Sequence, residues 1–208
     1  YPLKVLHEYQ MRIAEIKATL NWIMGASLSD LQAKSASSSS RLRLLPSSAI
    51  VLNELIDCFN PKKIALSSYG IREGLLYSAM DKKLRELDPL LEACRHIEST
   101  AARMPGFGLT LFNFIMPLFE TSDKNFVRLI KAACFLHDVS WRAHPDYRAE
   151  VCFDNATRAN LGGIDHQGRA FLAIALLYRY KSPKKSETFS KVFSILAKED
   201  NRRAEILG

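Results

Sequence analysis

From about Asp81 to its last residue, the chain carries only helical periodicity, and this feature constrains the fold most strongly. Apolar side chains recur every three or four residues, and proline or glycine separates the periodic segments. The alternation typical of a half-buried strand is missing from this region. We therefore predict an all-helical domain over residues 81–208. Its helices are expected within residues 81–104, 105–119, 123–139, 145–161, 165–180 and 186–200.

Residues 1–80 mix element types. Residues 3–24 have the spacing of an amphipathic helix, a Ser-rich joint follows, and a second helix begins near Pro46. The apolar run from Lys63 to Ser68 predicts a strand, and a short helix follows Gly70. One strand cannot form a sheet alone, so its partner is expected upstream of Tyr1 or in another chain. The fold class is therefore mainly α with a partial α/β segment, and we expect the sequence to be a piece of a longer protein.

The charge balance points to anionic partners. The formal net charge is +7 and the sequence pI is about 9.3, so the surface attracts polyphosphate, nucleotides, nucleic acid or anionic lipid. The longest apolar stretch, residues 107–119, is too short to span a bilayer, so no membrane insertion is expected. The four cysteines lack zinc-like spacing and are interpreted as reduced, buried thiols of a cytoplasmic protein.

Three stretches together resemble a known family. They are "RLRLLPSSAIVLNEL" with Arg41, "SSYGIREGLLY", and the region from "AACFLHDVSWRAHPDYR" to "LLYRYK". This pattern is similar to the C-terminal part of the exopolyphosphatase/guanosine pentaphosphate phosphohydrolase family, and the match spans most of residues 37–181. The shared residues in the helical part are Leu136, His137, Asp138, His144, Tyr147, Gly162, Gly163, Arg179 and Tyr180.

The resemblance implies both a fold and an activity. Residues 1–80 would be the incomplete end of a second actin-like (ribonuclease H-like) lobe, and residues 81–208 an HD-like all-helical domain. The activity would be Mg²⁺-dependent release of terminal phosphate from inorganic polyphosphate or guanosine pentaphosphate, and the sequence does not distinguish the two substrates. The family's Gly-rich phosphate loops and general base have no counterpart here, so Mg²⁺ is expected to bind mainly outside this segment. The resemblance leaves a homodimer open.

His137 and Asp138 allow two interpretations. An HD metal site would need an upstream histidine, for which His96 is the candidate, and a later carboxylate, Asp154 or Asp165. The alternative is a buried His–Asp hydrogen bond that fixes helix packing. We favour the second interpretation, because His96 has no supporting signal around it and no metal-ligand spacing accommodates His144 or His166.

Two groups of residues are candidates for phosphate binding, in addition to Arg41. Gly70 precedes a helix whose first N–H groups could bind an anion beside Arg72, although a purely structural role for both is favoured. A row of basic residues in the helical region suits a polyanion, and its densest part holds Arg179, Lys181, Lys184 and Lys185. The wider row also contains Arg142, Arg148, Arg158 and Arg169.

Three functions therefore compete. The leading hypothesis is a scaffold and polyanion-binding part of an exopolyphosphatase-like hydrolase, without catalytic residues of its own. The second is an HD-type metal-dependent nucleotide phosphohydrolase. The third is a non-enzymatic, polyanion-binding helical protein, although the sequence has no recognition-helix pattern or basic-aromatic repeat that predicts specific nucleic-acid binding.

Overall fold

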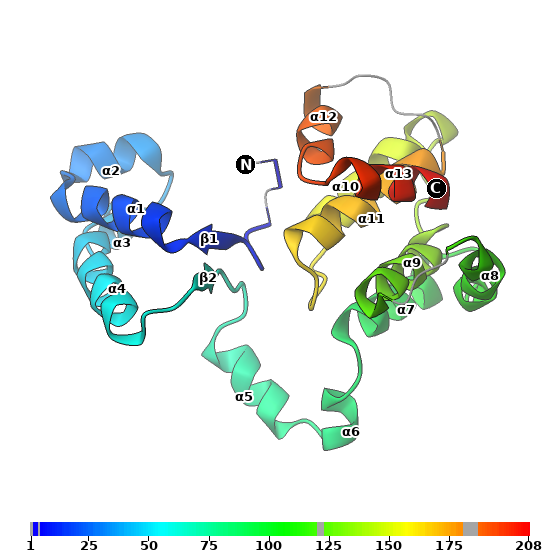
Figure 1. Ribbon diagram of the computed structural model, residues 1–208, viewed down its shortest axis with the longest axis horizontal. Coiled ribbons are helices and arrows are strands. Elements are labelled where there is room, and N and C mark those ends of the chain that lie inside the picture. Colours follow the sequence, from blue (N-terminus) through cyan, green and yellow to red (C-terminus); the bar gives the residue numbers. More distant parts are fainter. Residues whose placement is uncertain (1, 4, 120–122, 181–186) are drawn as a thin grey trace. The chain divides into compact units, whose positions relative to one another are not determined.

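The protein is mainly helical, as predicted, and it divides into two compact units. The structure is a computed structural model and describes every residue except 1, 4, 120–122 and 181–186. One unit is Tyr9–Ser67, and the other comprises Tyr1–Glu8 with Ser68–Gly208 (Figure 1). No helix among the described residues is long and apolar enough to cross a membrane.

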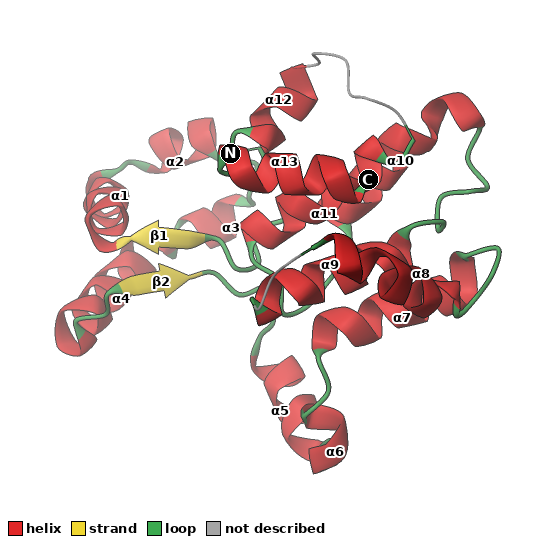
Figure 2. Ribbon diagram, turned by 45° about the vertical axis from the view of Figure 1, so that its right-hand side comes forward, coloured by secondary structure: helices red, strands yellow, loops and turns green. Residues whose placement is uncertain are grey.

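The unit Tyr9–Ser67 is a set of helices with one small sheet. Its elements are β1 (Gln10–Arg12), α1 (Ile13–Gly25), α2 (Leu28–Lys34), α3 (Ser39–Leu42), α4 (Leu45–Phe59) and β2 (Lys63–Ala65). The strands pair antiparallel, with Met11 opposite Ile64 (Figure 2). Ile16 and Leu20 of α1 pack against Ala49 and Ile56 of α4.

This arrangement corrects two predictions. The amphipathic helix begins at Ile13, because the residues before it form β1 and an irregular segment. β2 therefore has a partner within the chain, whereas we expected one outside it. A two-stranded sheet does not establish an actin-like lobe, so that assignment stays a prediction.

The larger unit is all helical among its described residues, and no strand is found in that part of residues 85–208. Its helices are α5 (Ile71–Ala79), α6 (Lys82–Arg85), α7 (Pro89–Ala101), α8 (Phe107–Ile115), α9 (Lys124–Leu136), α10 (Arg148–Arg158), α11 (His166–Tyr178), α12 (Glu187–Phe193) and α13 (Lys198–Leu207). Two single 3₁₀ turns, Met116–Leu118 and Pro145–Tyr147, lie after α8 and before α10.

Helix α11 lies at the centre of this unit. Every residue from Ala170 to Leu177 is buried, and the helix contacts α9, α10, α12 and α13. Figure 2 shows α11 with α13 and α10 on one side and α9 on the other. A helix that is apolar on all sides can only be stable when other elements cover it completely. The remaining helices, α7 and α8, pack on the outer side of α9.

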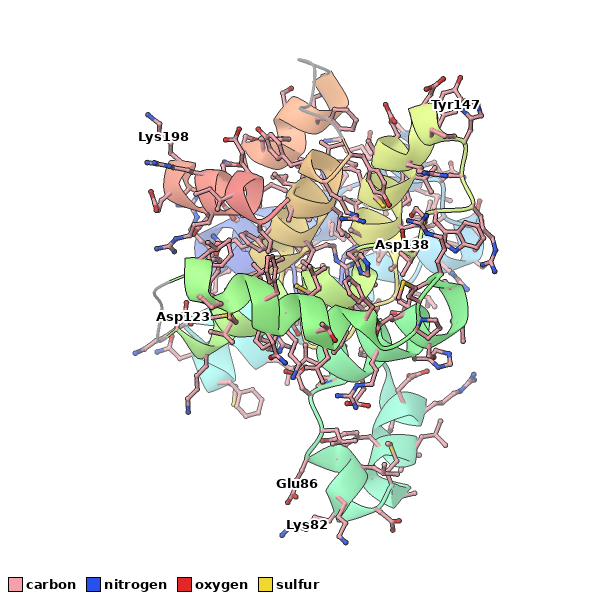
Figure 3. The ribbon with its side chains drawn as sticks, turned by 90° about the vertical axis from the view of Figure 1, so that its right-hand side faces the viewer. Lys82, Glu86, Asp123, Asp138, Tyr147 and Lys198 are labelled. Atoms are coloured by element: carbon pink, nitrogen blue, oxygen red, sulfur yellow. The ribbon has the colours of Figure 1, made fainter. Side chains whose placement is uncertain are left out.

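The segment before α7 is different, because α5 and α6 bury no residue. Figure 3 shows them standing away from the bundle, with Lys82 and Glu86 at their far end. In the sequence, the boundary between the compact units falls between Ser67 and Ser68, earlier in the chain than the predicted boundary at residue 80. The assignment of residues 1–80 and 81–208 as domains stays a prediction.

Local signals placed several helix ends correctly. The Asp123 side chain accepts a hydrogen bond from the Asn125 N–H and caps α9, as expected. Residues 81–104 are interrupted before Pro89, where the Asp88 side chain caps α7. Three cysteines are buried, but Cys58 is exposed, which corrects the expectation that all four would be buried.

Gly108 marks the closest approach of α8 to its neighbours. Its N–H donates to the buried carboxylate of Glu98 at 2.6 Å. A Cβ at this position would lie 2.7 Å from the Phe135 ring and 2.8 Å from the Cys134 carbonyl oxygen. Glycine is therefore needed here because a larger side chain would clash with these neighbours, and not because of its backbone angles.

We predict that Gly108→Ala destabilises the larger unit by about 1–3 kcal/mol, because the new methyl group overpacks a backbone contact. Urea or thermal unfolding measures the effect. The matched control is Gly74→Ala in the exposed helix α5, where a Cβ meets nothing within 4 Å. The control should be neutral or stabilising by up to about 1 kcal/mol. Equal stability of the two variants would contradict the packing described here.

Candidate functional site

The His137–Asp138 pair lies directly after α9, and both residues are buried. Figure 3 shows Asp138 within the bundle. His137 Nδ1 lies 2.8 Å from the carbonyl oxygen of Cys134. Because a carbonyl only accepts, the hydrogen is on Nδ1. Burial lowers the pKa of His137, which favours a neutral imidazole.

Asp138 is bound by an arginine and not by its neighbouring histidine. Arg103 donates from Nε to Oδ2 at 2.8 Å and from Nη2 to Oδ1 at 2.7 Å. These hydrogen bonds from Arg103 lower the pKa of Asp138. The bidentate pair joins the loop after α7 to the end of α9. The expected role in holding helices together is therefore present, but through Arg103 and not through a His–Asp hydrogen bond.

The alternative metal set is not brought together. His96 is exposed on α7, while both oxygens of Asp138 are used by Arg103. Asp165 caps α11 by accepting from the Gly168 N–H at 2.7 Å, and Asp154 pairs with Arg158. Within the described parts of the chain, no group of three or more His, Cys, Asp or Glu side chains is arranged to hold a metal ion.

Glu98 is the inward-facing acid that the sequence interpretation missed. It lies on α7 and is only 1% exposed. Its charge influences His137, and its carboxylate accepts from the Gly108 N–H. The signal was present in the spacing, because Leu90, Cys94 and Glu98 form one buried stripe at intervals of four residues. His96 lies between two such positions and faces away.

An aromatic and cationic cluster lies beside the pair. Trp141 donates from Nε1 to the carbonyl oxygen of Ala101 at 2.9 Å. The guanidinium groups of Arg142 and Arg103 lie 4.8 Å and 6.0 Å from the centre of its ring. The Tyr147 side chain is exposed at the outer edge of the unit (Figure 3). Two guanidinium groups, one of them paired with Asp138, thus lie near the Trp141 ring.

The predicted phosphate-binding residues belong to different elements. Arg41 is exposed on α3 of the smaller unit, and Arg72 is exposed on α5. Gly70 precedes α5 as expected, but its N–H donates to the Glu73 carboxylate at 2.7 Å, and this bond lowers the pKa of Glu73. The Gly70 N–H is therefore already bound by an acid from the first turn of α5.

The basic row is only partly described. Arg179 is exposed, with its guanidinium 5.3 Å from the centre of the Tyr180 ring, and it lines a cavity of about 140 Å³ together with His137. Lys181, Lys184 and Lys185 lie outside the described residues. Arg169 does not belong to this surface, because it is fully buried and donates to the carbonyl oxygens of Ala156, Ala159 and Leu161 at 2.7–3.2 Å.

In a comparison with known proteins, residues 107–208 match the family model described as exopolyphosphatase, C-terminal. The guanosine-5'-triphosphate,3'-diphosphate pyrophosphatase of Aeromonas salmonicida is 24% identical over 177 residues, which are 80% of this chain and 35% of that protein. Retrograde regulation protein 2 of Saccharomyces cerevisiae is 29% identical over 151 residues, which are 70% of this chain and 25% of that protein. The chain thus spans about a third and a quarter of these relatives.

We predict that Asp138→Asn lowers the free energy of unfolding by about 1–2 kcal/mol at neutral pH, because it removes the ion pair with Arg103. The loss is limited because the Arg103 side chain is half exposed and water screens its charge. The folded-state pKa of Asp138 is depressed, so this stability is complete above the ordinary carboxyl pKa of about 3.9 and is lost as pH falls through the folded-state value. The variant should therefore differ from the parent less in acid. Asp146→Asn, at an exposed carboxylate, is the control. A pH-independent difference would contradict this role for the pair.

Proposed function

Because the chain belongs, through residues 107–208, to the exopolyphosphatase family, we propose that it is part of a phosphoanhydride hydrolase that removes terminal phosphate from inorganic polyphosphate or guanosine pentaphosphate. The family resemblance expected from the sequence is confirmed. The match to the C-terminal exopolyphosphatase domain is the observation that carries the proposal. The relative from Aeromonas, whose name is that of a guanosine phosphate pyrophosphatase, supports the substrate class.

Within such an enzyme, this segment would act as a scaffold. Its one His–Asp pair is engaged in packing and in an ion pair with Arg103, so it does not offer a free carboxylate to a substrate. The described residues hold no cluster suited to Mg²⁺. We therefore assign Mg²⁺ and the general base to parts of the enzyme outside this segment, and we propose a cytoplasmic location. A homodimer stays an expectation.

A second candidate is a regulatory role without hydrolysis. It is favoured by the 29% identity to a protein named for retrograde regulation. Such a protein would use the same fold to bind a polyanion without cleaving it. The assay of phosphate release described next distinguishes the two candidates.

The proposal predicts Mg²⁺-dependent release of phosphate by a longer protein that contains this segment and has the length of its relatives. The substrates to test are polyphosphate and guanosine pentaphosphate. Residues 1–208 alone should release none, because the phosphate loops and general base are expected elsewhere. Malachite-green detection of phosphate, with and without a chelator, measures both. Turnover by residues 1–208 alone would contradict the scaffold role, and binding without turnover by the longer protein would favour the regulatory candidate.

A separate prediction concerns long polyphosphate. Replacing Arg179, Lys181, Lys184 and Lys185 with alanine should raise KM for long chains roughly tenfold, because each lost contact forfeits the release of condensed counterions. KM for short chains should change little. The dependence of long-chain affinity on salt should also flatten, which KM measured at two salt concentrations shows.

A matched control removes the same charge from other exposed positions. A variant with alanine at Lys62, Lys63, Lys82 and Lys83 has the same net charge as the first variant, and the region of Arg179 is unchanged in it. If both quadruple variants raise KM equally, general charge attraction explains the effect and the proposed polyphosphate surface is wrong.

A further inference from the structure

Helix α8 and the segments on either side of it present an uncharged outer face. Residues 104–119 contain no Asp, Glu, Lys, Arg or His. Figure 1 shows α8 at the edge of the larger unit, where it packs on α9. Five large apolar side chains of this stretch are exposed, by fractions that run from 37% for Phe107 to 78% for Phe114; the others are Met104, Leu109 and Leu118. An exposed apolar patch on a well-packed unit marks an interaction surface.

The inner side of α8 is fixed to the unit. Leu111, Phe112 and Ile115 pack against the core of the larger unit. The Gly108 N–H donates to the buried carboxylate of Glu98 at 2.6 Å. The exposed face is therefore carried by a helix that is held in place, so a partner can bind it without first ordering it.

Two other helices also expose apolar side chains, but neither has these properties. Helix α5 buries none of its own residues, and the cluster that α4 shares with α1 has four buried members among the described residues. Charged residues also interrupt both surfaces, with Arg72 and Glu73 on α5 and Glu54 on α4. Only α8, among the described helices, combines an uncharged outer face with a firm base in the larger core.

The composition of the α8 face favours a second copy of the chain as its partner. Two copies, each with a formal net charge of +7, repel one another, so they approach most easily where neither carries a charge. The exposed polar side chains of α8, Thr110 and Asn113, each contain a hydrogen-bond donor and an acceptor. Such a group can bond to its own copy in a two-fold interface. A polyanion or an anionic membrane would instead require basic residues on this face.

The exposed area suits a weak dimer. A large apolar side chain that is about half exposed contributes roughly 100 Å² when a partner covers it. The five side chains therefore bring roughly 500 Å² per copy, or roughly 1,000 Å² for the pair, which is about the lower limit for a specific interface. We expect a dissociation constant in the micromolar range from an interface of this size.

We propose that two copies of the chain pair through α8 about a two-fold axis. Antiparallel pairing brings Leu118 of one copy to Phe107 of the other. Asn113 lies near the middle of this stretch, so the Asn113 side chains of the two copies lie beside the axis. This surface does not depend on the proposed enzymatic activity, and it assigns a place to the homodimer that the family resemblance leaves open.

Sedimentation equilibrium of the 208-residue chain, at concentrations from about 1 to 100 µM, measures the assembly. We expect the mass to rise from the 23.5 kDa of one chain towards twice that value. Salt at about 1 M reduces the screening length to about 3 Å and should strengthen the pairing of two positively charged copies. The mass of a single chain at every concentration would overturn the proposal.

Exchange of charge at Asn113 tests whether the two α8 helices face one another. Asn113→Asp and Asn113→Lys each place like charges beside the axis, and each should weaken pairing at least about tenfold. An equimolar mixture of the two variants should pair again, because opposite charges then meet. Asn113 is exposed, so neither change disturbs the core, and a melting curve checks the fold. A mixture that stays monomeric would overturn the two-fold arrangement.

A second variant and two controls locate the surface. Phe114→Ala removes the most exposed apolar side chain of the patch and should weaken pairing about thirtyfold. Val51→Asp on α4 and Leu76→Asp on α5 alter the other exposed apolar faces and should leave the affinity unchanged. A dimer that survives Phe114→Ala and is lost in either control would overturn the assignment to α8. Because hydrolysis is not measured, these outcomes are separate from those that test the proposed function.

Discussion

The burial of α11 is the interaction on which the larger unit depends. From Ala170 to Leu177 the helix has no exposed side, so α9, α10 and α13 must pack around it. Its first turn is attached to the end of α10 by Arg169, whose guanidinium binds three carbonyl oxygens there. The negative end of a helix dipole favours that cation. One apolar helix and one buried arginine thus fix the position of α10.

Sequence reasoning predicted the helical elements well because capping and periodicity are local properties. Asp123 begins α9 as expected, and the interruption before Pro89 follows from its missing N–H. It failed where tertiary contacts decide. Gln10–Arg12 was read as helix, since three residues are too few to show alternation, and only pairing with Lys63–Ala65 makes it a strand. Arg169 was interpreted as a surface residue, because the sequence alone does not show that the carbonyl oxygens at the end of α10 lie next to it.

The burial of the His–Asp pair was predicted, but its hydrogen-bond partners were not. His137 and Asp138 are both buried, yet the partner of Asp138 is Arg103, a residue 35 positions earlier. A guanidinium satisfies both carboxylate oxygens with fixed geometry and permanent charge. It therefore gives the carboxylate the neutralisation that a metal ion would otherwise supply. The long sequence separation of this pair is why the arginine could not be identified from the local pattern around the aspartate.

The hydrogen bond between Glu73 and Gly70 has a consequence for any anion that approaches α5. The carboxylate is covalently tethered three residues away, so it competes as an intramolecular ligand at a high effective concentration. An external phosphate reaches the Gly70 N–H only by displacing this carboxylate. The Glu73 side chain thus acts as a tethered competitor for that N–H, because it cannot diffuse away.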